Sequence, residues 1–173
     1  MNGKSFYFAY GSNLHPVRLR ERVPSAALVG IARQSQYELR FHKKGADGSG
    51  KCNMCESLSA YVYGAIYELD SDHKKYLDRA EGKGKGYIDK DIIVVHGKDE
   101  YACFTYLAQP NYILANLAPY SWYKALVTIG ASYLGFPAEY LSNIESVVTV
   151  EDSCLARKKS MDALIERMIA YGN

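Results

Sequence analysis

The stretch Phe6-Tyr7-Phe8-Ala9-Tyr10-Gly11-Ser12-Asn13-Leu14 decides how the first part of this chain folds. Its first five residues are apolar or aromatic, which is typical of a short buried strand. Gly11 can adopt backbone angles that are closed to other residues, and Ser12 and Asn13 offer side-chain and backbone hydrogen-bond donors. Pro16 favours the start of a helix, so the sequence predicts a strand, a tight loop and a short helix in succession.

The loop after this strand allows two interpretations. Backbone amides near a helix N-terminus favour negative charge, so residues 11–14 could hold a carboxylate or an oxyanion that develops during a reaction. Gly-Ser-Asn is also common in an ordinary turn that connects a strand to a helix. The residues of the loop are compatible with both.

Further strands are indicated between this stretch and the middle of the chain. Apolar and polar residues alternate from Tyr37 to Phe41, which predicts a half-buried strand. Residues 60–69, 87–95 and 101–107 are rich in Tyr, Val and Ile and predict three more strands, the last two joined by a turn. The glycine-rich residues 45–51 predict a loop.

Helical patterns gather later in the chain. A short helix is predicted from Ser71 to an end at Gly82, and two others follow Pro119 and Pro137. Residues 161–169 carry apolar side chains on one face of an amphipathic helix. Because strands come first and helices later, the order argues against a doubly wound parallel sheet and favours a mixed α+β or small-barrel architecture.

Length and composition predict a single domain over residues 1–173. The chain is 48% hydrophobic and 23% charged, which is ordinary for a soluble globular protein. A net charge of +2 is too balanced to indicate a nucleic-acid or membrane surface. No stretch has the character of a signal peptide or a membrane span, so a cytoplasmic location is expected. The 16 Tyr residues indicate partly solvated positions, where the ring is buried and the hydroxyl reaches a polar group or water. Such positions occur in a polar cavity, in an interface or in a barrel wall.

Glu81 is a candidate general base. It closes the predicted helix that begins at Ser71, and the negative end of the helix dipole disfavours its charged form and raises its pKa. A carboxyl group of that kind can accept a proton and later release it. Alternatively, Glu81 is a solvated surface residue whose charge Lys83 and Lys85 offset.

Cysteine and histidine give weaker signals. Cys52 and Cys55 have the spacing of half a zinc site or of a redox pair, but no second pair follows. Free thiols in a reducing compartment are the better interpretation. The four His residues show no metal-like pairing, so no metal site is expected. Residues 120–123 open a predicted helix and either line a pocket or pack in the core.

Six patches, in the same order along the chain, resemble the γ-glutamylcyclotransferase family. They are residues 6–14, Pro24-Ser25-Ala26-Ala27, Leu77-Asp78 with Glu81-Gly82, Cys103-Phe104-Thr105-Tyr106-Leu107, Tyr123-Lys124 with Ile129-Gly130-Ala131, and Gly135-Phe136-Pro137-Ala138-Glu139-Tyr140. The Tyr-Gly-Ser-Asn motif is fairly specific, and the later Glu-Gly pair followed by Tyr87 strengthens the resemblance.

The resemblance implies a fold and a reaction. The fold is α+β, a small mixed six-stranded β-barrel flanked by helices. The reaction needs no cofactor and no metal. A γ-glutamyl amino acid or amine cyclises to 5-oxoproline and releases the free amine, an acyltransferase- or lyase-type step of glutathione metabolism. The implied partner is a small-molecule γ-glutamyl substrate, with no nucleic acid and no membrane, and a homodimer is allowed.

The family's functional residues fall on positions that this chain retains. Glu81 takes the place of the base. The implied substrate-binding residues are Tyr7, Phe8, Ala9, Tyr10, Gly11, Ser12, Asn13, Leu14, Tyr87 and Tyr123. The chain departs from the family in two expected loops: the spacing from Glu81 to Tyr87 is one residue shorter than in the animal enzymes, and residues 45–57 are peculiar to it.

These departures leave the leaving amine open. The substrate is either a γ-glutamyl amino acid or a specialised amine metabolite that carries a γ-glutamyl group. A third hypothesis is a catalytically silent, Tyr-rich binding module, and the retention of Glu81 beside an intact loop counts against it.

Overall fold

Five strands form one mixed sheet in the computed structural model, which describes residues 3–171. The strands are β1 (Lys4–Ala9), β2 (Ala27–Lys44), β3 (Gly50–Asp70), β4 (Tyr87–His96) and β5 (Asp99–Ala108), in the order β2-β3-β1-β5-β4. β1 is central, antiparallel to β3 and parallel to β5, and the two hairpins are antiparallel. The loop that follows β1 therefore leaves from the middle of the sheet.

β1 confirms the strand that the opening stretch predicts. Phe8 and Ala9 are fully buried, and Tyr7 is nearly so. A central strand that is covered on both faces is expected to be a continuous apolar run rather than an alternating one. Tyr7 stacks on Phe104 of β5, which ties the two parallel strands together through their side chains.

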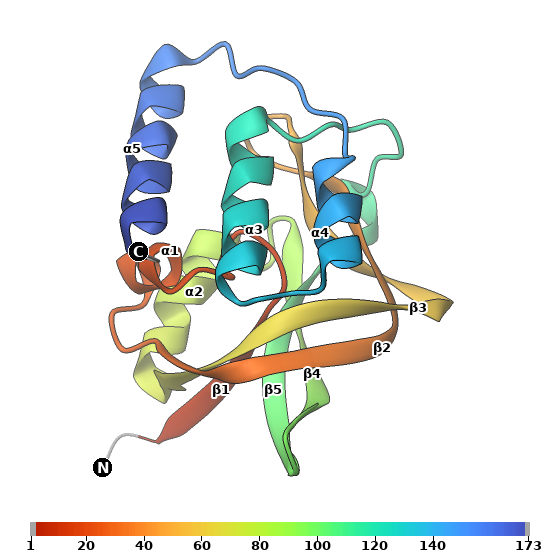
Figure 1. Ribbon diagram of the computed structural model, residues 1–173, viewed down its shortest axis with the longest axis vertical. Coiled ribbons are helices and arrows are strands. Elements are labelled where there is room, and N and C mark those ends of the chain that lie inside the picture. The colour runs from red at the N-terminus through yellow and green to blue at the C-terminus, as the bar shows by residue number, and fades with distance from the viewer. Residues whose placement is uncertain (1–2, 172–173) are drawn as a thin grey trace.

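The helices gather on one side of the long β2–β3 hairpin and beside β1 (Figure 1). They are α1 (Pro16–Arg22), η1 (Ser71–His73), α2 (Lys74–Glu81), η2 (Pro110–Tyr112), α3 (Ser121–Tyr133), α4 (Ala138–Glu145) and α5 (Leu155–Tyr171). The buried face of α3 carries Trp122, Tyr123 and Leu126. This is the helix predicted after Pro119, and it lies between α4 and α5 (Figure 1).

The expected six-stranded barrel is wrong, because the sheet has five strands within residues 3–171 and is not closed. Its edge strands, β2 and β4, approach each other through side chains instead. His96 Nδ1 lies 2.9 Å from the backbone oxygen of Ile31, and Lys90 Nζ donates to Tyr37 Oη at 3.0 Å. The fold is therefore α+β with a strongly curved open sheet.

The expected loop at residues 45–57 is also mostly wrong. Only residues 45–49 form the loop, and Gly50 to Ser57 belong to β3, where Cys55 pairs with Glu38 and Met54 with Leu39. Register shifts between Ser35 and Tyr37 and between Arg40 and Lys43 interrupt the alternation of side chains in β2. Because each shift resets the period of two, the sequence pattern shows only fragments of these long strands.

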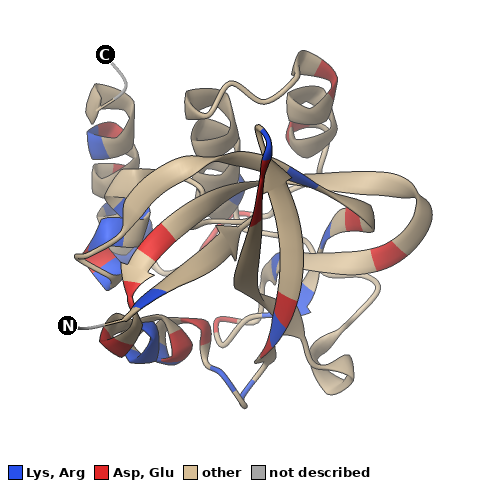
Figure 2. Cartoon of the chain, turned by 90° about the horizontal axis from the view of Figure 1, so that it is seen from below, with Lys and Arg blue, Asp and Glu red and all other residues tan. Residues whose placement is uncertain are grey.

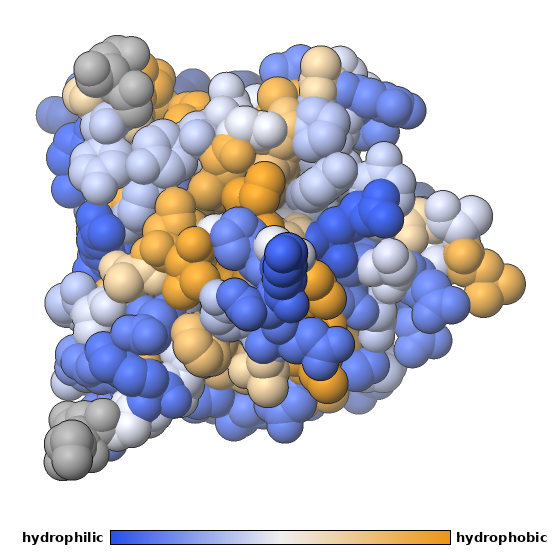
Figure 3. Space-filling view, turned by 60° about the horizontal axis from the view of Figure 1, so that its bottom comes forward, coloured by the Kyte–Doolittle hydropathy of each residue, from blue (hydrophilic) through white to orange (hydrophobic). Residues whose placement is uncertain are grey.

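Residues of both charge signs are distributed along the helices and strands (Figure 2). Apolar side chains also reach the surface, in a band across one face of the molecule (Figure 3). Among the described residues, no helix combines the length and the apolar character that crossing a membrane requires.

Candidate active site

The loop that follows β1 makes one wall of an internal cavity. Leu14 N donates to Gly11 O at 3.0 Å, which closes a tight turn. Within residues 3–171, the backbone amides of Ser12 and Asn13 have no acceptor in the protein, so they are left to bind a ligand.

The physical reason for glycine at position 11 differs from the predicted one. Gly11 does not have a positive φ, so the prediction that it adopts backbone angles closed to other residues is wrong. A Cβ at this position would instead lie 2.9 Å from Cys52 Cβ on β3, closer than side chains pack. Glycine is required here because two backbones approach each other.

The cavity brings together most of the residues that the resemblance implies. Its lining consists of Tyr7, Tyr10, Gly11, Ser12, Asn13, Cys52, Glu81, Tyr87, Tyr106 and Tyr123. The inner part, of ≈ 20 Å³, has room for about one water molecule. Through Ser12, Glu81, Tyr87 and Tyr123 it adjoins an outer cleft of ≈ 710 Å³.

Phe8, Ala9 and Leu14 are not in this lining. They are 0%, 0% and 1% exposed and belong to the hydrophobic core. Phe8 follows Tyr7 in β1 and points to the opposite face of the sheet, since neighbouring side chains of a strand alternate. For these three residues the structure supports a packing role in place of the expected substrate contact.

Glu81 is the last residue of α2, as the sequence predicts. Gly82 follows it with φ of 64°, the left-handed conformation that ends many helices, and Lys83 N donates to Asp78 O at 2.8 Å. The Glu81 side chain is 15% exposed. Its Oε1 accepts a hydrogen bond from Asn13 Nδ2 at 2.9 Å, so the carboxylate is joined directly to the loop after β1.

Arg22 is the partner of Glu81 that the sequence analysis misses. Its Nη1 lies 2.6 Å from Glu81 Oε1 and 3.0 Å from Asn13 Oδ1. The guanidinium places a positive charge directly against the carboxylate at the end of α2, so the helix dipole is only part of the environment of Glu81. Arg18 and Arg22 are four residues apart and therefore lie on one face of the predicted helix. This spacing is the feature of the sequence that could have indicated a cationic partner for Glu81.

The other titratable groups of the lining are protonated near neutral pH. Burial raises the pKa of five tyrosine hydroxyls above their ordinary value, those of Tyr7, Tyr10, Tyr87, Tyr106 and Tyr123. The negative charge of Glu81 adds to this shift at Tyr7. Burial also raises the pKa of the Cys52 thiol to about 12. Glu81 is therefore the carboxylate that this lining offers as a proton acceptor.

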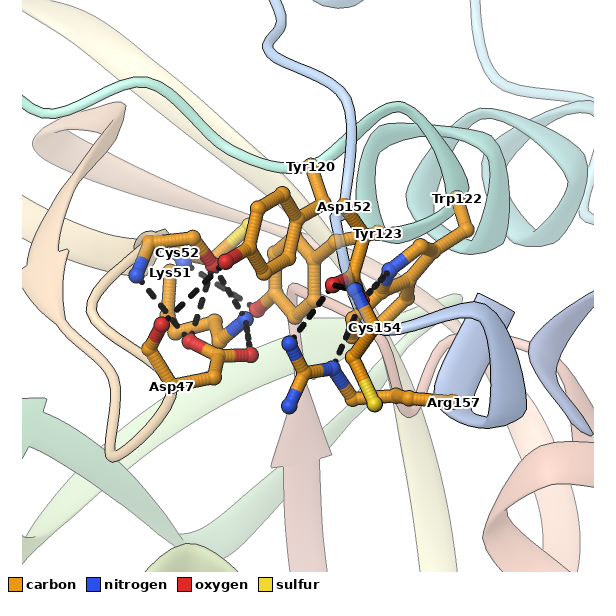
Figure 4. Close-up of polar contacts among 10 residues, drawn as sticks. Asp47, Lys51, Cys52, Tyr120, Trp122, Tyr123, Asp152, Cys154 and Arg157 are labelled. Atoms are coloured by element: carbon orange, nitrogen blue, oxygen red, sulfur yellow. Dashed lines mark hydrogen bonds and ion pairs between the residues drawn. The ribbon is translucent and has the colours of Figure 1, made fainter.

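Two tyrosines that line the cavity hold the start of β3 in place through hydrogen bonds to its backbone. Tyr87 Oη donates to Cys52 O at 2.5 Å, and Cys52 N donates to Tyr123 Oη at 3.1 Å. Lys51, beside Cys52, pairs with Asp47 at 2.8 Å and lies over the ring of Tyr123 (Figure 4). The contacts lock the outer end of the hairpin against α3.

Cys52 and Cys55 do not act as a pair. All four cysteines are free, and Cys52 is buried in the cavity wall, whereas Cys55 Sγ lies 3.1 Å from His42 Nε2. In a strand, residues three apart point to opposite faces. Among the described residues, no three His, Cys, Asp or Glu side chains are grouped so that they could hold a metal ion.

Comparison with known proteins gives concordant matches. The model of the AIG2-like family matches residues 61–144. A γ-glutamylcyclotransferase from Bos taurus is 32% identical over 155 residues, which cover 84% of this chain and 80% of that protein. The enzyme of the same name from Homo sapiens is 32% identical over 149 residues, covering 82% and 77%.

Solved structures agree with these matches. A structure named γ-glutamyl cyclotransferase superposes with a TM-score of 0.84 at 24% identity, covering 95% of this chain and 99% of that one. An uncharacterized human protein superposes with a TM-score of 0.77 at 26% identity, covering 94% and 98%. At these identities the likeness in structure supports the fold.

Proposed function

Because this chain belongs to the γ-glutamylcyclotransferase family, we propose that it converts a γ-glutamyl amide to 5-oxoproline and the free amine, without a cofactor. The observation that carries the proposal is the position of Glu81. Its carboxylate lines the cavity beside the two unbonded amides of the loop after β1, and Asn13 and Arg22 hold it in place.

The chemistry requires a group that takes up a proton and returns it. The α-amino nitrogen of the substrate attacks its own γ-carbonyl carbon, a C–N bond forms, and the bond to the leaving nitrogen breaks. Overall, the α-ammonium group loses two protons and the leaving nitrogen gains two, so no proton is consumed. Glu81 serves as the base for the attacking nitrogen and then as the acid for the leaving one.

The loop after β1 supplies the second element of catalysis. The amides of Ser12 and Asn13 stabilise the negative oxygen of the tetrahedral intermediate, and losing one such donor typically costs ~10²–10³ in rate. Because ring closure is intramolecular, the protein mainly has to hold the folded conformer, and well-oriented reactions of this kind reach effective molarities of ~10⁵–10⁸ M. The inner cavity is small, so the γ-glutamyl group extends into the outer cleft.

The direct test is 5-oxoproline release from a panel of γ-glutamyl amino acids and γ-glutamyl amines. Turnover of at least one member is expected. Turnover restricted to a single amine would favour the specialised relative, in which the cleft accepts one metabolite. A folded protein that binds panel members but releases no 5-oxoproline would establish the silent binding module instead.

A further inference from the structure

Three tyrosines of the inner cavity give their hydroxyl protons to acceptors in the protein. Tyr10 Oη donates to the backbone oxygen of Tyr106 at 2.5 Å. Tyr87 Oη donates to the backbone oxygen of Cys52 at the same distance. Tyr106 Oη donates to a carboxylate oxygen, Oδ1 of Asp78, at 2.6 Å. Because a phenol has a single proton, each of these oxygens can offer only lone pairs to a ligand in the cavity.

Tyr106 differs from the other two tyrosines because its acceptor is charged. The same Oδ1 atom of Asp78 also accepts from Lys74 Nζ at 2.7 Å, so this ion pair fixes the oxygen in front of the hydroxyl. A hydrogen bond to an ionised group is strong, and it polarises the phenol, which makes Tyr106 Oη a better acceptor for a further hydrogen bond. Asp78 is not in the cavity lining, so it acts on the cavity through Tyr106.

The Tyr106 hydroxyl lies beside the proposed base. Asp78 and Glu81 are three residues apart on α2 and therefore share one side of this helix. Burial raises the pKa of Tyr106, and the hydrogen bond to Asp78 and the negative charge of Glu81 add to this shift. The hydroxyl is therefore protonated near neutral pH. Its oxygen and the Glu81 carboxylate lie on the same side of the cavity, along α2.

The substrate brings a group that requires acceptors of this kind. An α-ammonium group has three N–H donors, and it loses most of its hydration in a cavity with room for about one water molecule. Oε1 of Glu81 already accepts from Asn13 and Arg22, so the carboxylate cannot satisfy all three donors. Once Glu81 has removed a proton, the nitrogen has a lone pair that must attack the γ-carbonyl. An acceptor beside a remaining N–H leaves this lone pair free, whereas a donor would bind it and prevent the attack.

We propose that Tyr106 Oη accepts a hydrogen bond from the attacking α-amino nitrogen, and that Asp78 is the positioning residue that holds the Tyr106 proton out of the cavity. The inference rests on the proposed function, because it assigns the nitrogen end of the same site. Without Asp78, the hydroxyl would turn its proton toward the lone pair of the amine. The two residues together recognise the α-amino group and keep its lone pair available for ring closure.

A binding experiment isolates the contact with the α-amino group. L-Glutamate and glutarate have the same chain length and the same two carboxylates, and only glutamate carries an α-ammonium group. Isothermal titration calorimetry measures both affinities without turnover. A hydrogen bond to a charged group is worth roughly ten- to hundredfold in affinity, so the wild-type protein should bind glutamate more tightly than glutarate by at least ~tenfold. Tyr106→Phe should lose roughly tenfold or more of this preference.

Asp78 is tested with two substitutions and a matched control. Asp78→Leu removes the acceptor, so both the preference for glutamate and kcat for 5-oxoproline release should fall. Asp78→Asn keeps an acceptor oxygen, which Lys74 holds at the position of Oδ1, and should retain most of the preference. Asp70→Leu removes a carboxylate of similar exposure that pairs with Lys4 at 3.0 Å outside the cavity lining, and should behave as the wild type. Thermal melts establish that the variants fold.

The outcomes separate this inference from the proposed function. Glutamate that binds the wild-type protein no more tightly than glutarate overturns the inference, whether or not 5-oxoproline is released. A preference that survives in Tyr106→Phe overturns the assignment of the acceptor. A preference that survives in Asp78→Leu, or that is lost in Asp78→Asn, overturns the role of Asp78. Absence of 5-oxoproline release, together with a preference that depends on Tyr106, would remove the proposed function and confirm Tyr106 as the acceptor for the ammonium group.

Discussion

At the scale of single residues, Glu81 and its partners concentrate the chemistry. Asn13 bonds Glu81 and also donates to Tyr7 Oη at 3.1 Å, so the carboxylate, the amide and the phenol form one connected group. The connection passes from α2 to the loop after β1 and back into the sheet. A small displacement of any one of these three side chains should therefore change the hydrogen bonds of the other two.

Replacing the carboxylate tests the proton transfer. Glu81→Gln keeps the size of the side chain and can still accept from Asn13, but it cannot take up a proton, so kcat should fall at least ~10²-fold. Glu100→Gln, on the exposed start of β5, is the matched control and should retain wild-type kcat. Release of 5-oxoproline is measured for both, with thermal melts. A folded Glu81→Gln protein with wild-type kcat would show that Glu81 is not the base.

The loop after β1 can be tested with two neighbouring substitutions. Gly11→Ala places a Cβ 2.9 Å from Cys52 Cβ and should displace the backbone donors, whereas Ser12→Ala leaves them in place. Gly11→Ala should therefore reduce kcat/KM by more, on the order of the ~10²–10³ that one lost oxyanion donor costs. Equal and small reductions in the two folded variants would mean that the loop only connects β1 to α1.

At the scale of elements, α1 is held by a buried imidazole. His15 is the N-cap of this helix, and its Nδ1 accepts from Val17 N at 3.2 Å. His15 is completely buried, and burial lowers its pKa from 6.5 to about 4. Because α1 carries Arg22, the cap helps to place the cation beside Glu81.

This cap predicts how stability depends on pH. Between pH 6.5 and about 4, His15 binds a proton in the unfolded chain but not in the folded protein. The free energy of unfolding should therefore decrease by roughly 3 kcal/mol when the pH is lowered from 6.5 to about 4. His15→Asn keeps a capping acceptor and has no titrating group, so its stability should fall less over the same range. Denaturant unfolding at a series of pH values measures the difference. Parallel curves for the two proteins would contradict the prediction.

At the scale of the whole molecule, one buried carboxylate attaches the C-terminal part of the chain to the site. Asp152 accepts from Trp122 Nε1 at 2.9 Å and from Arg157 at 2.6 Å (Figure 4). The Arg157 guanidinium holds the pKa of Asp152 well below its usual range. Trp122 precedes Tyr123 in α3, so α5 is linked to the cavity wall through this contact.

Removing the cation should destabilise the molecule. Arg157→Met leaves the buried carboxylate without its counter-ion, and we expect a fall of several degrees in Tm. Lys158→Met removes an exposed ion pair with Glu151 and should change Tm little. Calorimetry of the two variants at pH 7 compares them. Equal Tm values would show that the attachment of α5 does not depend on Arg157.

The sequence by itself determined the local features of this protein. The apolar run of β1, the helix start at Pro16 and the helix end at Gly82 follow from preferences that act over a few residues. The position of Glu81 at a helix end could therefore be predicted from the sequence, and the motifs were enough to indicate the family. The predicted single domain over residues 1–173, the homodimer and the cytoplasmic location stay predictions.

Only the tertiary structure decided what surrounds these features. Arg22 and Glu81 are 59 residues apart, and they meet because α1 and α2 both pack at the end of the central strand. Lys43 reaches Tyr87 because register shifts in β2 turn its side chain into the cleft, and β4 is the strand at the other edge of the same sheet. The openness of the sheet was likewise decided by the tertiary structure. Strand order, register and curvature depend on contacts between distant segments, and a periodic pattern in one segment carries no information about its partner.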